Sequence, residues 1–213
     1  MSLIAFLFNW FVKITGWIPQ LIIFKIKVFY EDRSVSKRIK GKAIVISNHN
    51  YLLDFGLLLF VFWRRTLRCA VAEVMYEKRF FMSIFLKLLG CIKVNRNSHD
   101  FTFLDKCKDV LDKGGVVEIF PEGRLPKEGD ELPLPFNTGY VHLALESGAP
   151  IIPVYNNAKL FAREHTKVVI GKPINVSDLY DTSLSERENI TKINDIIRSK
   201  IIELGKELER KEI

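Results

Sequence analysis

Residues 43–54 read Ala43-Ile44-Val45-Ile46-Ser47-Asn48-His49-Asn50-Tyr51-Leu52-Leu53-Asp54, and this stretch decides how the chain folds. Its first four residues are apolar and mostly β-branched, which is typical of a buried strand. Polar residues follow, and the pattern over 43–60 predicts a strand, a turn and a helix. Because loops at strand ends often carry chemistry, His49 and Asp54 are the first candidate pair.

Short apolar runs recur along the rest of the chain and alternate with longer segments of helical pattern. Such alternation is typical of an α/β domain. We therefore expect a mixed, mostly parallel sheet flanked by helices, in one domain that covers residues 31–213. The expected strands are Ala43–Ser47, Leu67–Ala72, Val116–Phe120, Ile151–Tyr155 and Lys167–Ile170.

Apolar residues at helical spacing, ended by glycines, predict the helices. The expected helices are 75–88, 99–113, 139–147 and a C-terminal helix that begins at Ser185. Ser185 and Glu188 have the spacing of a capping box, in which each side chain bonds the other's backbone N–H. The stretch 122–138 is rich in proline, glycine and acidic residues, and an irregular segment of that length is usually functional or mobile.

Residues 1–30 are apolar, but Asn9, Lys13, Gly16 and Pro19 interrupt them. A spanning helix needs about 20 continuous apolar residues, so no clean span is predicted. We expect a hairpin of two short helices, broken near residues 16–19, that enters one leaflet with its tryptophans and lysines at the headgroup level. Packing of these helices on the protein's own core and a one-pass anchor both remain open.

The composition favours an anionic partner. The chain has 213 residues, a net charge of +7 and 48% hydrophobic residues. Bases without acids in residues 1–30 favour an anionic membrane surface over a nucleic acid, and no basic-aromatic strand surface is evident. We expect a protein at the cytoplasmic face of the cell membrane. The 3 cysteines are widely spaced and lack neighbouring ligands, so neither a disulfide framework nor a metal site is predicted.

Four blocks lie at or near the ends of predicted elements, and together they carry a family resemblance. They are Asn48-His49-x4-Asp54, Gly90-Cys91-Ile92-Lys93-Val94-Asn95-Arg96, Phe120-Pro121-Glu122-Gly123-Arg124 and Pro150-Ile151-Ile152-Pro153-Val154. In this order, over about residues 41–171, the chain resembles the glycerolipid acyltransferases with the HxxxxD motif. Within that family it is similar to the 1-acyl-sn-glycerol-3-phosphate acyltransferases.

The resemblance implies a membrane-associated O-acyltransferase of phospholipid biosynthesis. Such an enzyme moves a fatty acyl group from acyl-CoA or acyl-carrier protein to the hydroxyl of a lysophosphatidate, giving phosphatidate. The donor is a co-substrate, and no cofactor or metal is expected. Three other hypotheses stay open: acylation of another lysolipid, hydrolysis with the same base, and a peripheral lipid-binding protein without catalysis.

His49 and Asp54 suit this chemistry on physical grounds. An alcohol needs a base to remove its proton, and a carboxylate on the other ring nitrogen fixes the tautomer of a histidine base. Positions five apart diverge by about 140° on a regular helix. We therefore expect His49 in the turn before the helix and Asp54 within its first turns, close enough to hydrogen-bond.

The resemblance also implies substrate-binding residues. Arg96 would bind the acceptor phosphate and Arg124 would be a second cationic contact, since guanidinium groups match phosphate oxygens. For Glu122 two roles stay open, holding an acceptor hydroxyl or positioning Arg96, and Gly123 would allow close approach of the backbone to substrate. Two departures are visible, because the family commonly has Glu-Gly-Thr-Arg-Ser in the third block and Phe-Lys-x-Gly downstream. Here Leu125 follows Arg124 directly, and Asn137 replaces the lysine.

Overall fold

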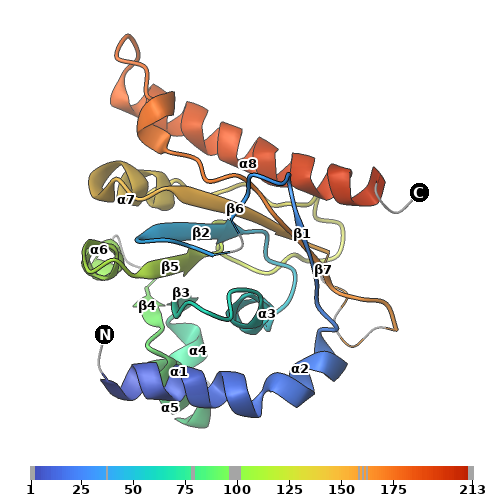
Figure 1. The fold of residues 1–213 in the computed structure, drawn as a ribbon. Helices are drawn as coiled ribbons and strands as arrows, with labels where there is room; N and C mark the ends of the chain where they lie inside the picture. Colours follow the sequence, from blue (N-terminus) through green and yellow to red (C-terminus); the bar gives the residue numbers. More distant parts are fainter. Residues whose placement is uncertain are drawn as a thin grey trace.

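The computed structural model describes residues 3–36, 38–77, 80–95, 102–157, 159, 161 and 163–210. Its centre is a sheet with the strand order β1-β7-β6-β2-β5-β3-β4 (Figure 1). Neighbouring strands are parallel except β6 and β7, which are antiparallel. The strands are β1 (Lys27–Tyr30), β2 (Ala43–Ser47), β3 (Leu67–Ala72), β4 (Ile92–Val94), β5 (Val116–Ile119), β6 (Ile151–Asn156) and β7 (Lys167–Ile170). The predicted mixed, mostly parallel sheet is confirmed.

Helices flank this sheet on both faces (Figure 1). In chain order the described helices are α1 (Leu3–Thr15), α2 (Trp17–Ile23), α3 (Asp54–Val61), α4 (Val74–Glu77), α5 (Phe80–Leu89), α6 (Thr102–Asp112), α7 (Gly139–Ser147), the 3-10 helix η1 (Val176–Leu179) and α8 (Glu186–Arg210). The capping box before α8 is present, since the Glu188 carboxylate accepts from the Ser185 backbone N–H at 2.9 Å. Where one helix is predicted over 75–88, the structure has α4 and α5. The first residues of the predicted helix 99–113 lie outside the described residues.

Two apolar layers hold the elements together. On one face Ile44, Ile46 and Val117 pack with residues of α6, α7 and α8. On the other face Val45 and Val116 pack against α3 and against Phe24 at the end of α2. Because β2, β5, β3 and β6 are mutually parallel, their carboxyl ends meet at one edge of the sheet. That edge is where ligands bind in open α/β sheets.

The N-terminal hairpin is broken at Gly16 as predicted. Its polar side chains face the protein, and most of its large apolar side chains face outward. The buried residues of α1 include Asn9 and Lys13, whereas most of its large apolar residues are exposed. The exposed apolar residues of the hairpin are Leu3, Ile4, Phe6, Leu7, Phe11, Ile14, Trp17, Ile18, Leu21 and Ile22. No single described helix is long and apolar enough to span a membrane. The pair α1 and α2 meets those criteria only together, and it is bent by 57°.

Lys13 corrects the expectation that the lysines of the hairpin lie at the headgroup level. Its ammonium group donates to the carbonyl oxygens of Phe62, Trp63 and Arg65, at 3.3, 2.8 and 2.7 Å, just beyond the end of α3. Burial lowers the pKa of Lys13 to about 8. Asn9 donates to the Leu89 carbonyl at the end of α5 in the same way, at 2.9 Å. The polar side of α1 is therefore bonded to the domain.

Strand β1 corrects the boundary between the predicted hairpin and the domain. The sequence assigns residues 1–30 to the hairpin, but Lys27–Tyr30 pair in parallel with Lys167–Ile170 at the edge of the sheet. This strand has no apolar alternation of its own in the sequence. Its conformation is set by the partner strand 140 residues later, as the register of Lys27 with Lys167 records.

Candidate active site

The turn after β2 is held in place by an amide network. The Asn48 side chain accepts from the Asn156 backbone N–H at 2.9 Å and donates to the Asn156 carbonyl at 2.9 Å. Asn50 also donates to that carbonyl, at 3.3 Å. Both asparagines 48 and 156 are buried at the carboxyl ends of neighbouring parallel strands. The network ties the residues on either side of His49 to β6.

His49 and Asp54 adopt the predicted geometry. His49 lies in the turn, Asp54 begins α3, and His49 Nδ1 lies 3.1 Å from Asp54 Oδ2. The same oxygen accepts from the backbone N–H groups of Asn50 and Tyr51, at 2.7 and 2.9 Å. The Asp54 carboxylate is completely buried, and the His49 side chain is 15% exposed. With Nδ1 engaged by the carboxylate, Nε2 is the nitrogen that remains to accept a proton.

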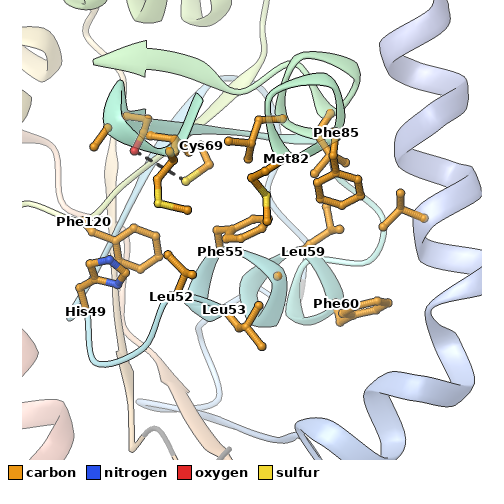
Figure 2. A pocket seen from close by; sticks show the side chains of 18 of the residues that line it. His49, Leu52, Leu53, Phe55, Leu59, Phe60, Cys69, Met82, Phe85 and Phe120 are labelled. Atoms are coloured by element: carbon orange, nitrogen blue, oxygen red, sulfur yellow. Dashed lines mark hydrogen bonds between the residues drawn. The ribbon is translucent and has the colours of Figure 1, made fainter. Parts of the chain in front are cut away.

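Phe120 stabilises the His49 ring from one side. The two rings are stacked with centroids 4.4 Å apart and an interplanar angle of 25° (Figure 2). Phe120 directly follows β5, so the stacking depends on the parallel pairing of β2 with β5. Asp54 and Phe120 thus fix both the direction and the plane of the imidazole.

Among the residues that the structure describes, Glu122 accepts hydrogen bonds from two backbone N–H groups. Its Oε1 accepts from the His49 N–H at 2.8 Å, and its Oε2 accepts from the Leu134 N–H at 3.0 Å. Burial raises the pKa of Glu122, and the two N–H donors only partly offset that effect. The two roles that the sequence left open, holding an acceptor hydroxyl and positioning Arg96, stay predictions, because Arg96 lies outside the described residues. The two hydrogen bonds of Glu122 join the turn that carries His49 to Leu134 in the long loop 122–138.

We expect Glu122→Gln to lower both stability and activity. A glutamine has one acceptor oxygen, so its NH2 group would face one of the two backbone N–H donors. Leaving a buried donor unpaired costs about 1–3 kcal/mol, and the His49 backbone would shift. Thermal unfolding and initial rates measure the two effects. Glu146→Gln, on an exposed residue of α7, is the matched control and should change neither. A fully active Glu122→Gln enzyme would contradict the positioning role.

Gly123 has a positive φ of +70°. A Cβ atom there would lie 2.8 Å from Asn137 Nδ2, which itself donates to the Pro121 carbonyl at 2.9 Å. The glycine is therefore required by the turn and by Asn137, which occupies the position where the resembling family commonly has lysine. Asn137 closes the turn of the third block from the far end of the loop.

Of the two arginines predicted to bind phosphate, the structure describes Arg124. Arg96 lies outside the described residues. Arg124 forms a bidentate ion pair with Asp130, through Nη1 at 2.6 Å and Nη2 at 3.2 Å. The Asp130 carboxylate also accepts from the Lys127 N–H at 2.6 Å, and these contacts lower the pKa of Asp130 to about 2. Arg124 is thus oriented by an acidic residue of its own loop.

Two cavities meet at Phe120, on which the His49 ring is stacked. The apolar cavity, of about 480 Å³, is lined by residues of α1, α2, α3, β3 and α5 together with His49 and Phe120. Figure 2 shows His49 and Phe120 at one end of it and Phe85 toward the opposite end. The polar cavity, of about 580 Å³, contains Glu122, Gly123 and Asn137. Phe120 and Arg124 line both cavities.

Cysteine is the other residue type beside the apolar cavity that could act as a nucleophile. Cys69 lines the apolar cavity, but burial raises the pKa of its thiol well above the usual value, which disfavours a reactive thiolate. Among residues whose placement is described, no group of three or more His, Cys, Asp and Glu side chains could hold a metal ion. His49 is the base that faces a cavity of substrate size.

Comparison with known proteins assigns the class that this site defines. The model of the family named Acyltransferase matches residues 25–157, so the chain belongs to the acyltransferase family. The 1-acyl-sn-glycerol-3-phosphate acyltransferase of Haemophilus influenzae is 27% identical over 92% of this chain and 84% of its own length. The protein of the same name from Borreliella burgdorferi is 29% identical over 90% of this chain and 74% of its own length.

A solved structure shares the fold. The crystal structure of the 1-acyl-sn-glycerophosphate acyltransferase from Thermotoga maritima matches with a TM-score of 0.64 and 18% sequence identity. The match covers 94% of this chain and 79% of that one. The shared fold thus extends over nearly the whole length of this chain.

Proposed function

We propose that the protein transfers a fatty acyl group from a thioester to the free hydroxyl of a 1-acyl-sn-glycerol-3-phosphate, giving phosphatidate. One observation carries this proposal: the hydrogen-bonded His49–Asp54 pair faces the apolar cavity, and His49 is stacked on Phe120, which lines the polar cavity as well. An acyl chain in the apolar cavity and a phosphorylated head in the adjoining polar cavity can therefore lie near one base. The names of the relatives supply the acceptor.

The reaction needs only a base and a bound donor. His49 Nε2 removes the proton as the acceptor oxygen attacks the thioester carbonyl, and Asp54 stabilises the imidazolium that forms. A new C–O bond forms and the C–S bond breaks. The proton on His49 then goes to the departing thiolate, which leaves as a free thiol. Transfer is direct, and no residue carries the acyl group.

The positive charge of Arg124 supports binding of the phosphorylated part of the substrates in the polar cavity. Arg124 lies beside Glu122 and Gly123 there, and Arg96 is the second cation assigned to the acceptor phosphate. A phosphate at Arg124 has to share the guanidinium with Asp130, or displace it. The acyl donor is acyl-CoA or acyl-carrier protein, and neither is favoured by the described residues. The proposed steps draw on side chains and co-substrate alone.

A purified-enzyme assay tests this proposal. The full chain is supplied with lysophosphatidate or other lysolipids, and with acyl-CoA or acyl-carrier protein thioester, while free thiol, acylated lipid and free fatty acid are measured. We expect thiol release that depends on lysophosphatidate and equals phosphatidate formed. Fatty acid in place of phosphatidate would indicate a hydrolase. Transfer only to another lysolipid would replace the acceptor, and no thiol release would indicate a lipid-binding protein without catalysis.

We also propose that α1 and α2 lie in one leaflet, at the cytoplasmic face of the cell membrane. The exposure of the hairpin supports this, since its polar side is bonded to the domain and most of its large apolar side chains are exposed. Phe80 and Phe81 on α5 extend the same exposed apolar surface, at 74% and 84% exposure. A contiguous exposed apolar patch of this kind marks a membrane or protein contact.

We expect the double variant Leu7→Ser/Ile18→Ser to bind vesicles at least 10-fold more weakly. Each side chain is more than half exposed, so the substitutions should leave the fold intact. Removing a buried apolar side chain from the leaflet costs about 1.5–3 kcal/mol. Vesicle co-sedimentation measures the partition coefficient. The control variant Leu132→Ser/Ile196→Ser changes exposed apolar residues outside the hairpin and should bind like the wild type. Equal loss in both variants would contradict the placement.

A further inference from the structure

A third cavity, which we call the basic pocket, opens at the opposite end of the sheet from His49. It has a volume of about 370 Å³ and is formed at the amino ends of β3 and β5, whereas His49 and Glu122 follow carboxyl ends. Strands of this length separate the two sites by about 15 Å. The side chains that define the basic pocket are Phe6, Arg64, Arg65, Thr66, Arg68 and Lys113.

The basic pocket has an excess of positive charge. Four of its side chains are cationic, and the acid that lines it is Asp109. Arg64, Lys113 and Asp109 are exposed, and none of their side chains has a hydrogen bond or ion pair within the described part of the chain. Arg65 is fixed at the back of the pocket, because its Nη2 donates to the carbonyls of Gly41 and Gly114 at 2.7 and 2.8 Å.

Arg68 has no anionic partner among the residues that the structure describes. Its side chain is only 9% exposed, and it donates to the Leu89 carbonyl at 3.2 Å. No carboxylate lies within ion-pair distance of it in the described ranges. Its guanidinium lies over Gly90, where a Cβ atom would be 1.1 Å from Nη1. A buried charge without an anionic partner is costly, so the pocket is built for an anion.

Helix α1, which lies beside the basic pocket, indicates the source of that anion. Phe6 of α1 forms part of the wall, and its neighbours Leu3, Ile4 and Leu7 belong to the exposed apolar side of the hairpin. Asn9 of the same helix and Arg68 both donate to the Leu89 carbonyl, so helix and pocket are bonded at one point. An anion bound here has apolar surface beside it that suits lipid tails.

We propose that the basic pocket binds the phosphate group of an anionic membrane phospholipid, with the acyl tails of that lipid lying along α1. Guanidinium groups match phosphate oxygens in pairs, and basic pockets beside membrane helices suit anionic headgroups. Such a lipid would hold the enzyme in a defined orientation on the leaflet. The inference rests on the proposed membrane placement of the hairpin, and it does not depend on the acceptor or donor.

Vesicle binding by the full chain tests the proposal. Vesicles of phosphatidylcholine alone measure insertion of the hairpin, and vesicles with added phosphatidylglycerol measure the contribution of the anionic headgroup. We expect wild type to bind the phosphatidylglycerol vesicles more tightly. The variant Arg64→Gln/Lys113→Gln should lose about 10- to 30-fold of that gain, since each base near an anionic surface contributes about a factor of five.

Two further variants separate a pocket from a diffuse field. Thr66→Tyr fills the basic pocket without changing its charge, and it should lose the gain from phosphatidylglycerol as well. Arg187→Gln/Lys206→Gln removes two exposed charges from α8, on the far side of the sheet from α1, and should keep the gain (Figure 1).

The outcomes are distinguishable from failure of the membrane placement. Thermal unfolding confirms that each variant is folded, and phosphatidylcholine binding by each should equal that of the wild type. Absence of any vesicle binding by the wild type would overturn the hairpin placement and this proposal together. Binding that is equal on both vesicle types, or full binding by Thr66→Tyr, would overturn the basic pocket alone. Reversal of the gain by millimolar inorganic phosphate would identify a free-phosphate site instead of a lipid site.

Discussion

Replacing His49 by alanine is expected to lower the rate of acyl transfer to lysophosphatidate by about 10²- to 10⁴-fold, the usual contribution of a general base. The alcohol would have to lose its proton to water, and no other histidine lines the apolar cavity as described. Free-thiol release under saturating substrates measures the effect. The imidazole contributes one ion-pair contact to the fold, at 3.1 Å to Asp54, so the variant should still fold and still bind vesicles.

His142→Ala is the matched control for this variant. His142 lies on α7, and its side chain has no hydrogen bond or ion pair among the described residues, so its replacement should leave the rate unchanged. Near-normal activity of the His49→Ala enzyme would overturn the proposed mechanism. A loss of activity with a loss of folded protein would move His49 from the chemistry to the structure, and circular dichroism separates these results.

Asp54→Asn is expected to reduce kcat by about two to four orders of magnitude, with a smaller change in KM. Asp54 Oδ2 accepts three hydrogen bonds, from His49, Asn50 and Tyr51. An asparagine is neutral, so it cannot stabilise the imidazolium that forms in the transition state. An effect confined to the transition state lowers kcat and kcat/KM together.

The control for this substitution is Asp195→Asn, on an exposed position of α8. It should leave both kinetic constants unchanged. A change in KM alone for Asp54→Asn would mean that the carboxylate organises substrate binding and takes no part in proton transfer. The three hydrogen bonds to Oδ2 also hold the turn, so a melting curve accompanies the kinetics.

The local part of the site could be predicted from the sequence. Strand β2, the turn at His49 and the start of α3 at Asp54 are contiguous, so periodicity and a single turn determine them. The same is true of α7, which is ended by Gly148, and of the capping box at Ser185. These features depend on neighbours within a few residues.

The rest of the site depends on contacts between distant segments. Asn156 holds Asn48 from 108 residues away, and Phe120 reaches His49 only because β5 pairs with β2. The sequence contains no regular spacing that reveals which strands pair with each other. Asn48 next to a candidate histidine was the one available signal, since a buried amide after a strand usually has a partner.

The orientation of the N-terminal hairpin on the domain could not be predicted from its composition. Lys13 interrupts an apolar run, and on composition alone such a lysine belongs at a membrane surface. The carbonyls that bind it belong to residues about 50 positions later. Strand β1 is similar, because only its partner β7 gives it an extended conformation.

The wall of the apolar cavity contains Val12, Gly16 and Pro19 from the hairpin, together with Phe85 from α5. With α1 and α2 in the leaflet, as proposed, this part of the wall is in contact with lipid on its other side. A fatty chain can then move sideways from the bilayer to His49 without passing through water. Removal of the first 24 residues would therefore open the cavity as well as free the domain from the membrane. The resulting chain would have lost its route for lipid, and raising the concentration of substrate in solution should not restore its rate.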